Sequence, residues 1–143
     1  MTLVNKEIIR RKLVKMSEYL QELARLEDIS YSDYISDFKH KRSVERLIQL
    51  LVDVAVDINS HVLVDEGFAP PQDAFDSFIK VGQIGILPYE FAEAIAPATG
   101  ERNIIVHEYE AIDDALVYDS IKETLKMFNE YRGYYLTFLL KRD

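Results

Sequence analysis

Three side chains with complementary chemistry lie within one short stretch of this chain. Arg102, His107 and Tyr109 supply a permanent cation, a group that exchanges protons near neutral pH, and a phenol. They belong to residues 101–113, which read ERNIIVHEYEAID. Cleaving RNA at a 2′-hydroxyl needs a base, an acid and positive charge on the phosphate, and this set can provide all three. The stretch is therefore the candidate site.

A single straight helix would not aim these three side chains at one point. A helix turns about 100° per residue, so Arg102 and Tyr109 would share a face and His107 would lie roughly 140° away. We therefore expect a break or bend near Gly100 and Asn103, combined with completion of the site by a second copy of the chain. Asn103 is expected to position the phosphate or the histidine, or to make a local turn hydrogen bond.

The spacing of these residues resembles the R-x4-H-x-Y signature of HepT toxins in the HEPN superfamily, whose members are mostly small all-helical ribonucleases. The residues that flank the signature are similar as well, namely Asn103, Val106, Glu108, Ile112 and Asp113. A second block, residues 46–61, resembles the central helix of that family, including the grouping of Asp57, Asn59 and His61. Together the two blocks cover most of the chain in the expected order.

The resemblance implies a HEPN-type homodimer that acts as a metal-independent endoribonuclease, the toxin of a toxin–antitoxin pair. It assigns Arg102 and His107 to catalysis with Asn103 in support, and it calls for no cofactor and no metal. It also implies a partner, a minimal nucleotidyltransferase antitoxin called MNT, which transfers AMP from ATP to the tyrosine that matches Tyr109. A phosphate added beside Arg102 would occupy that cation and block RNA.

Two other functions fit the residues. The first is a non-catalytic helical dimer that binds a nucleotidyltransferase partner or a nucleotide and keeps the motif only as a binding surface. The second is a metal-dependent hydrolase in which Asp57 and His61, on one helical line with Asp53, act as ligands. A third ligand near them cannot be identified in the sequence. An ordinary surface pair is therefore the favoured interpretation of Asp57 and His61.

The periodicity of apolar residues predicts an all-α bundle of five or six helices, which must position the motif. Long amphipathic helices are expected over residues 6–27, about 38–64 and about 114–140, and the second of these should be the central element. Shorter helices are expected after Ser30, Asp73 and Pro88, and Asp113 is a natural N-cap for the last long helix. The tyrosines of that helix, Tyr131 and Tyr135 among them, are expected to be core or dimer interface rather than a base-stacking surface.

Length and composition agree with one domain, residues 1–143. The 143 residues are 48% hydrophobic and contain no cysteine, which excludes disulfides and thiolate ligands. No apolar run of about 20 residues exists to span a membrane, and the N-terminus lacks the continuous apolar core of a signal peptide. We therefore expect a cytoplasmic protein that does not enter a membrane.

The distribution of charge limits where RNA can bind. The net charge is −8, but residues 1–50 carry ten Lys or Arg against eight acids and stand at +2. Residues 51–143 carry seven against seventeen and stand at −10. Because phosphate binding needs clustered cations, any contact with nucleic acid should involve the first half of the chain together with Arg102.

Overall fold

The computed structural model describes residues 3–141, and the regular structure in that range is helical. The elements in chain order are α1 (Leu3–Ala24), α2 (Tyr31–Ser36), α3 (Phe38–Asp65), α4 (Ala74–Gln83), α5 (Tyr89–Ile95), α6 (Ala98–His107), the 3-10 helix η1 (Tyr109–Ala111) and α7 (Asp114–Lys141). The expected all-α bundle is confirmed. Within the described residues there are seven α-helices, one more than predicted, because α6 is a separate helix after α5.

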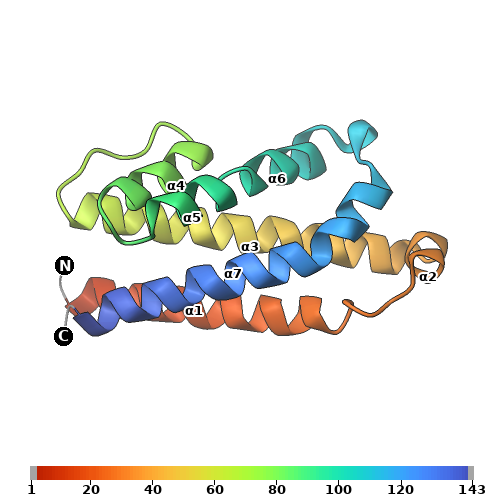
Figure 1. Ribbon diagram of the computed structural model, residues 1–143, viewed down its shortest axis with the longest axis horizontal. Helices are drawn as coiled ribbons and strands as arrows, with labels where there is room; N and C mark the ends of the chain where they lie inside the picture. The colour runs from red at the N-terminus through yellow and green to blue at the C-terminus, as the bar shows by residue number, and fades with distance from the viewer. Residues whose placement is uncertain (1–2, 142–143) are drawn as a thin grey trace.

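The 28-residue helix α3 is the central element of the bundle (Figure 1). Helices α1 and α7 pack against one side of α3, and α4, α5 and α6 lie along its other side. The apolar stripe predicted for α3 is buried along almost the whole helix, because neighbours cover it on both sides. Removal of this apolar surface from water is the main favourable contribution to the fold.

Within residues 3–141, α3 is the one helix with the length and apolar composition of a membrane span. Half of its most apolar window is buried inside the bundle. The remaining positions of α3 include the charged residues Arg46, Asp53 and Asp57. The core position of α3 therefore accounts for its hydropathy.

Aspartate side chains define where the helices begin. Asp37 and Asp73 accept hydrogen bonds from backbone N–H groups in the first turns of α3 and α4. Asp113 accepts from the N–H groups of Ala115 at 3.0 Å and Leu116 at 3.2 Å, which confirms its predicted role at the start of α7. This cap fixes the point at which the chain leaves η1, next to the motif.

A buried hydrogen-bond network connects α3 with α4 and α7. Asn59 is fully buried, and its Oδ1 accepts hydrogen bonds of 2.7 Å from the hydroxyls of both Tyr131 and Tyr135. Its Nδ2 donates to Oγ of Ser77 at 3.2 Å. Both tyrosines are also fully buried, so they belong to the core, and burial raises the pKa of each hydroxyl. The network gives each of these buried polar groups a partner.

Gly82 allows α5 to pack against α4 just before the chain turns into α6. A Cβ at this position would lie 2.5 Å from Cβ of Ala92. We expect Gly82→Ala to lower the free energy of unfolding by about 1–3 kcal/mol, because the two helices must move apart. Gly133→Ala is the matched control. It adds a methyl group in open space on α7 and should raise the same free energy by roughly 0.5–1 kcal/mol. Urea unfolding measures both, and a stabilised Gly82→Ala would contradict the expectation.

Candidate functional site

The motif lies on α6 and on the 3-10 turn that follows it. Helix α6 runs from Ala98 to His107 without interruption. Gly100 and Asn103 both lie inside it, so the predicted break near these residues is wrong. Gly100 lies in the first turn and not in the helix interior, where glycine is most unfavourable, and its N–H donates to the carbonyl of Pro97 at 3.0 Å. The interruptions lie outside the helix instead, at Pro97 before it and at Glu108 after it, where φ is −128° and ψ is 47°.

Arg102 is held by an acid on the central helix. Its Nε donates to Oδ1 of Asp53 at 2.8 Å, and its Nη1 donates to Oδ1 of Asn103 at 3.2 Å. The side chains of Arg102 and Asp53 are 25% and 40% exposed, so the pair lies at the surface of the bundle. Among the described residues these bonds use two of the five N–H donors of the guanidinium. The others can bind an anion.

His107 and Tyr109 are open to solvent. His107 is the last residue of α6, and Tyr109 in η1 is 71% exposed. They line a shallow hollow of about 290 Å³ together with Glu108, Glu110 and Ala111. A bulky substrate or a modifying enzyme can therefore reach both side chains without any rearrangement of the core.

One chain does not bring Arg102 and His107 together. Because α6 is continuous between them, the two side chains leave the helix roughly 140° apart, with a rise of about 7.5 Å along the axis. Arg102 is directed at α3, where it meets Asp53. The break at Glu108 frees Tyr109 from the helical register but comes too late to redirect His107. A site that uses both residues on one phosphate therefore needs groups from elsewhere.

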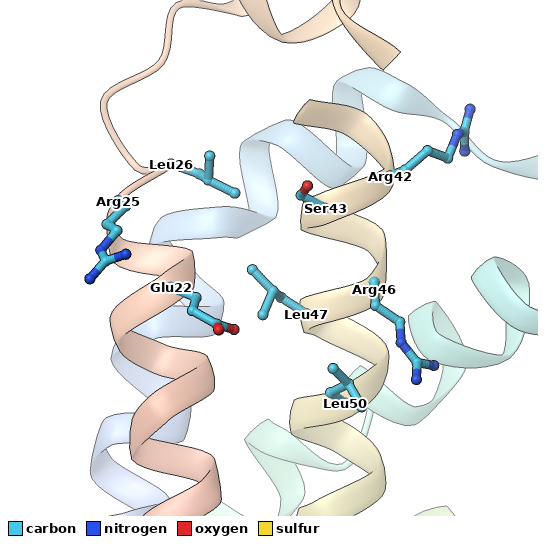
Figure 2. A pocket seen from close by; sticks show the side chains of 8 residues that line it. All are labelled: Glu22, Arg25, Leu26, Arg42, Ser43, Arg46, Leu47 and Leu50. Atoms are coloured by element: carbon cyan, nitrogen blue, oxygen red, sulfur yellow. The ribbon is translucent and has the colours of Figure 1, made fainter. Parts of the chain in front are cut away.

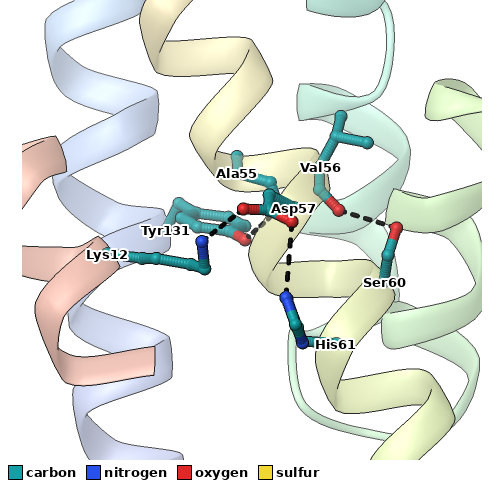
Figure 3. A network of polar contacts seen from close by, with 7 residues as sticks. All are labelled: Lys12, Ala55, Val56, Asp57, Ser60, His61 and Tyr131. Carbon is teal, nitrogen blue, oxygen red and sulfur yellow. Dashed lines mark hydrogen bonds and ion pairs between the residues drawn. The ribbon is translucent and has the colours of Figure 1, made fainter. Parts of the chain in front are cut away.

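The second group predicted from the sequence forms a line of polar contacts from α1 to α3 (Figure 3). Oδ1 of Asp57 lies 3.6 Å from Nε2 of His61, and Oδ2 of Asp57 is bonded to Nζ of Lys12 on α1. The lysine neutralises the carboxylate and ties α1 to α3. Within residues 3–141, no three His, Cys, Asp or Glu side chains are grouped closely enough to hold a metal ion. Asp57 and His61 lie one turn apart on the surface of α3, at the distance of an ion pair when the imidazole is protonated.

A carboxylate beside the motif lies in an apolar hollow between α6 and α7. Glu101 lines this hollow of about 330 Å³ together with apolar neighbours that include Ile104 and Leu116. Oγ of Ser120 donates to Oε1 of Glu101 at 2.9 Å. Burial raises the pKa of Glu101 above its ordinary value, and the hydrogen bond from Ser120 offsets part of that rise.

The raised pKa of Glu101 predicts a pH-dependent effect on stability. The folded state binds this proton more tightly than the unfolded chain does, so the contribution is present below the ordinary pKa and is lost as pH rises through the folded pKa. We expect Glu101→Gln, which keeps an acceptor for Ser120, to raise the free energy of unfolding at neutral pH and to have less effect in acid. Urea unfolding at the two pH values tests this, with Glu123→Gln on the exposed face of α7 as control. An equal gain at both pH values would contradict it.

Comparison with known proteins identifies the family. Residues 16–134, which include the whole motif, match the family described as Ribonuclease HepT-like. The chain belongs to this family. A tRNA nuclease HepT from Aphanizomenon flos-aquae is 38% identical over 131 residues, which are 92% of this chain and 89% of that protein. An mRNA nuclease HepT from Shewanella oneidensis is 25% identical over 100 residues, which are 70% of this chain and 75% of that protein.

A solved structure shows that this HepT-like chain has the HEPN fold. The tri-AMPylated HEPN toxin of Shewanella oneidensis, solved in complex with its MNT antitoxin, superposes with a TM-score of 0.82 at 21% identity. The superposition covers 100% of both chains. The family and fold implied by the R-x4-H-x-Y signature are thereby confirmed.

Asp53 is the residue of the candidate site that the sequence did not connect with Arg102. In the sequence it is one end of a line with Asp57 and His61, and its pairing with Arg102 spans 49 positions. One signal was available. Arg102 is the single Lys or Arg between Lys80 and Lys122, so a carboxylate from another helix was its natural partner. Helical periodicity alone cannot say which carboxylate.

Proposed function

We propose that this protein is the single-domain, cytoplasmic toxin of a toxin–antitoxin pair, a metal-independent endoribonuclease that cuts RNA at a cleft between two copies of the chain. One observation carries the proposal. This HepT-like chain presents the R-x4-H-x-Y signature at its surface, with Arg102 held by Asp53 and with His107 and Tyr109 exposed. Relatives named as a tRNA nuclease and an mRNA nuclease support RNA as the substrate class.

The proposed reaction is an attack of the ribose on the adjacent phosphate. A base takes the proton of the 2′-hydroxyl, its oxygen bonds to phosphorus, the P–O5′ bond breaks, and an acid protonates the leaving O5′. The products are a 2′,3′-cyclic phosphate and a 5′-hydroxyl end. His107 acts as base or acid, and Arg102 donates two parallel hydrogen bonds to the phosphate oxygens as their charge grows. Asn103 supports the arginine through the bond to Nη1.

A homodimer supplies what a single chain lacks. Arg102 and His107 diverge on the continuous helix α6, so one protomer cannot place its own pair on both sides of a phosphate. A two-fold axis through the motif would bring two arginines and two histidines to one cleft. The base and the acid then come from different protomers.

The partner that we propose is a nucleotidyltransferase antitoxin of the MNT type. Tyr109 is the AMP acceptor, and its exposure on η1 makes the hydroxyl accessible to such an enzyme. The added phosphate is negative and lies in the same motif as Arg102, so it competes with RNA for the cation. The AMPylated toxin and its MNT partner from Shewanella oneidensis support this assignment.

The proposal is tested by cleavage of a mixed RNA pool by the purified protein in excess chelator, with Arg102→Ala and His107→Ala in parallel. Cleavage by the parent protein alone supports metal-free chemistry by the motif. If mass spectrometry finds Tyr109 unmodified and none of the three proteins cuts RNA, the non-catalytic dimer that binds a nucleotidyltransferase or nucleotide replaces the proposal. Activity that disappears with chelator would overturn metal independence.

A further inference from the structure

A hollow of about 540 Å³ lies between the end of α1 and the first half of α3, outside the motif (Figure 2). Its apolar floor is formed by Leu26, Leu47 and Leu50. Three arginines also line the hollow: Arg25 follows the end of α1, and Arg42 and Arg46 lie on α3. Glu22 and Ser43 complete the lining. Figure 2 shows Glu22 and Ser43 between the two helices, with the guanidinium groups on the outer sides. We call this hollow, with its basic rims, the arginine groove.

Two of the three arginines form no ion pair with an acid of the described residues. Arg42 is bonded to Glu45 one turn away, a carboxylate that is itself almost buried. Arg25 and Arg46 form no ion pair within residues 3–141. Glu22 is the one acid that lines the groove. The three arginines and one glutamate give the lining a positive charge, although the net charge of the chain is −8.

One rim of the arginine groove, Arg46, lies on the face of α3 that leads toward the motif. Arg46 and Asp53 are seven residues apart on this helix, so they share one face and lie roughly 10 Å apart along its axis. Asp53 is the residue that holds Arg102.

We propose that the arginine groove binds the RNA strand beside the scissile phosphate. Arg25 and Arg46 bind phosphates on its two rims, and the leucine floor accepts an unstacked base. The inference rests on the proposed ribonuclease function and adds the path that the strand takes. RNA is favoured over an acidic protein surface because Arg46 at the groove and Arg102 at the motif can then bind phosphates of the same strand. The positive first half of the chain is consistent with this path.

The test uses the full-length protein with Arg25→Ala and Arg46→Ala together. Affinity is measured by fluorescence anisotropy with a labelled single-stranded RNA whose 2′-hydroxyls are methylated, so that it binds and is not cut. KM and kcat are measured separately on unmodified RNA. We expect the affinity to fall and KM to rise by at least about tenfold, with kcat unchanged, since each arginine makes a charge-assisted bond to phosphate. The slope of affinity against salt should decrease by about one per arginine.

The matched control removes the same charge elsewhere, with Arg11→Ala on α1 and Lys126→Ala on α7, both exposed. It should leave affinity and KM near the parent values. If the groove variant behaves like this control while the parent cuts RNA, the groove proposal fails and the ribonuclease proposal stands. If the parent does not cut RNA but the groove variant loses affinity for RNA, the ribonuclease proposal fails and the groove remains an RNA-binding surface. Loss of binding to an MNT partner with unchanged RNA affinity would assign the groove to the partner and overturn the inference.

Replacing Glu22 should have the opposite effect on RNA affinity from replacing the arginines. A carboxylate between the helices repels phosphate, so Glu22→Gln should tighten RNA binding severalfold and lower KM. Glu123→Gln removes one negative charge on the exposed face of α7 and controls for net charge. Weaker binding by Glu22→Gln, or equal gains in both variants, would contradict a phosphate path through the groove.

Discussion

Replacing His107 by alanine is expected to lower the rate of RNA cleavage by about 10²–10⁴-fold, the contribution typical of a positioned proton-transfer group. The fold should not change. The histidine is exposed at the end of α6, and its side chain makes no hydrogen bond or ion pair within residues 3–141. The free energy of unfolding should therefore stay within about 0.5 kcal/mol of the parent value. Initial rates at saturating RNA and urea unfolding measure the two quantities, and a loss of both together would contradict the assignment.

A dimer with a single His107→Ala protomer shows whether the two protomers share one cleft or cleave RNA independently. Protomers with different affinity tags allow the mixed dimer to be purified. If the base and the acid come from different protomers, the mixed dimer should be nearly as slow as the double variant. Half of the parent rate would mean that each protomer acts independently, which would contradict the shared cleft. The parent dimer, purified through both tags, is the control.

Replacing Asn59 by alanine is expected to lower the free energy of unfolding by roughly 3–5 kcal/mol, the largest effect on stability among the substitutions considered. The change removes the acceptor of the Tyr135 hydroxyl, one acceptor of the Tyr131 hydroxyl and the donor to Ser77, and it leaves a cavity in a closed core. Tyr131 keeps a hydrogen bond to the carbonyl of Ala55 at 2.9 Å. Urea unfolding at neutral pH measures the difference.

Two further variants show whether the loss of stability in Asn59→Ala comes from the unpaired hydroxyl of Tyr135. Ser60→Ala changes the neighbouring residue, whose Oγ bonds the carbonyl of Val56 on the same helix, and should have little effect because alanine favours the helix. Tyr135→Phe added to Asn59→Ala removes the orphaned hydroxyl and should recover part of the lost stability. If the double variant is less stable than Asn59→Ala by the full cost of Tyr135→Phe alone, the hydrogen-bond explanation fails.

The long helices could be predicted from the sequence because their signals are local. Apolar spacing defined α3 and α7, and a capping aspartate at position 73 or 113 marked a helix start that the structure confirms. The bend expected near Gly100 was wrong because a glycine in a first turn has little effect on the helix. The bend was expected to act together with a second copy of the chain, and the continuous helix α6 does not supply it.

The parts of the site that the sequence left open depend on contacts between distant residues. The pairing of Arg102 with Asp53, and that of Lys12 with Asp57, joins different helices and has no local periodicity. The sequence grouped Asn59 with Asp57 and His61 but did not predict that Asn59 is buried. Its burial results from the packing of α4 and α7 against α3. The residue types of the motif predicted its chemistry, and packing decided which acid holds the arginine.

The continuity of α6 has a consequence for how activity depends on the concentration of the chain. If Arg102 and His107 act only across a pair of chains, cleavage activity follows the concentration of pairs. Below the dissociation constant of the dimer, the number of pairs varies with the square of the number of chains, so a tenfold dilution lowers activity about a hundredfold. A few chains that escape an antitoxin are then nearly harmless, and each cell division reduces their effect further. Cleavage of cellular RNA becomes appreciable only when the concentration of free chains approaches the dissociation constant of the dimer.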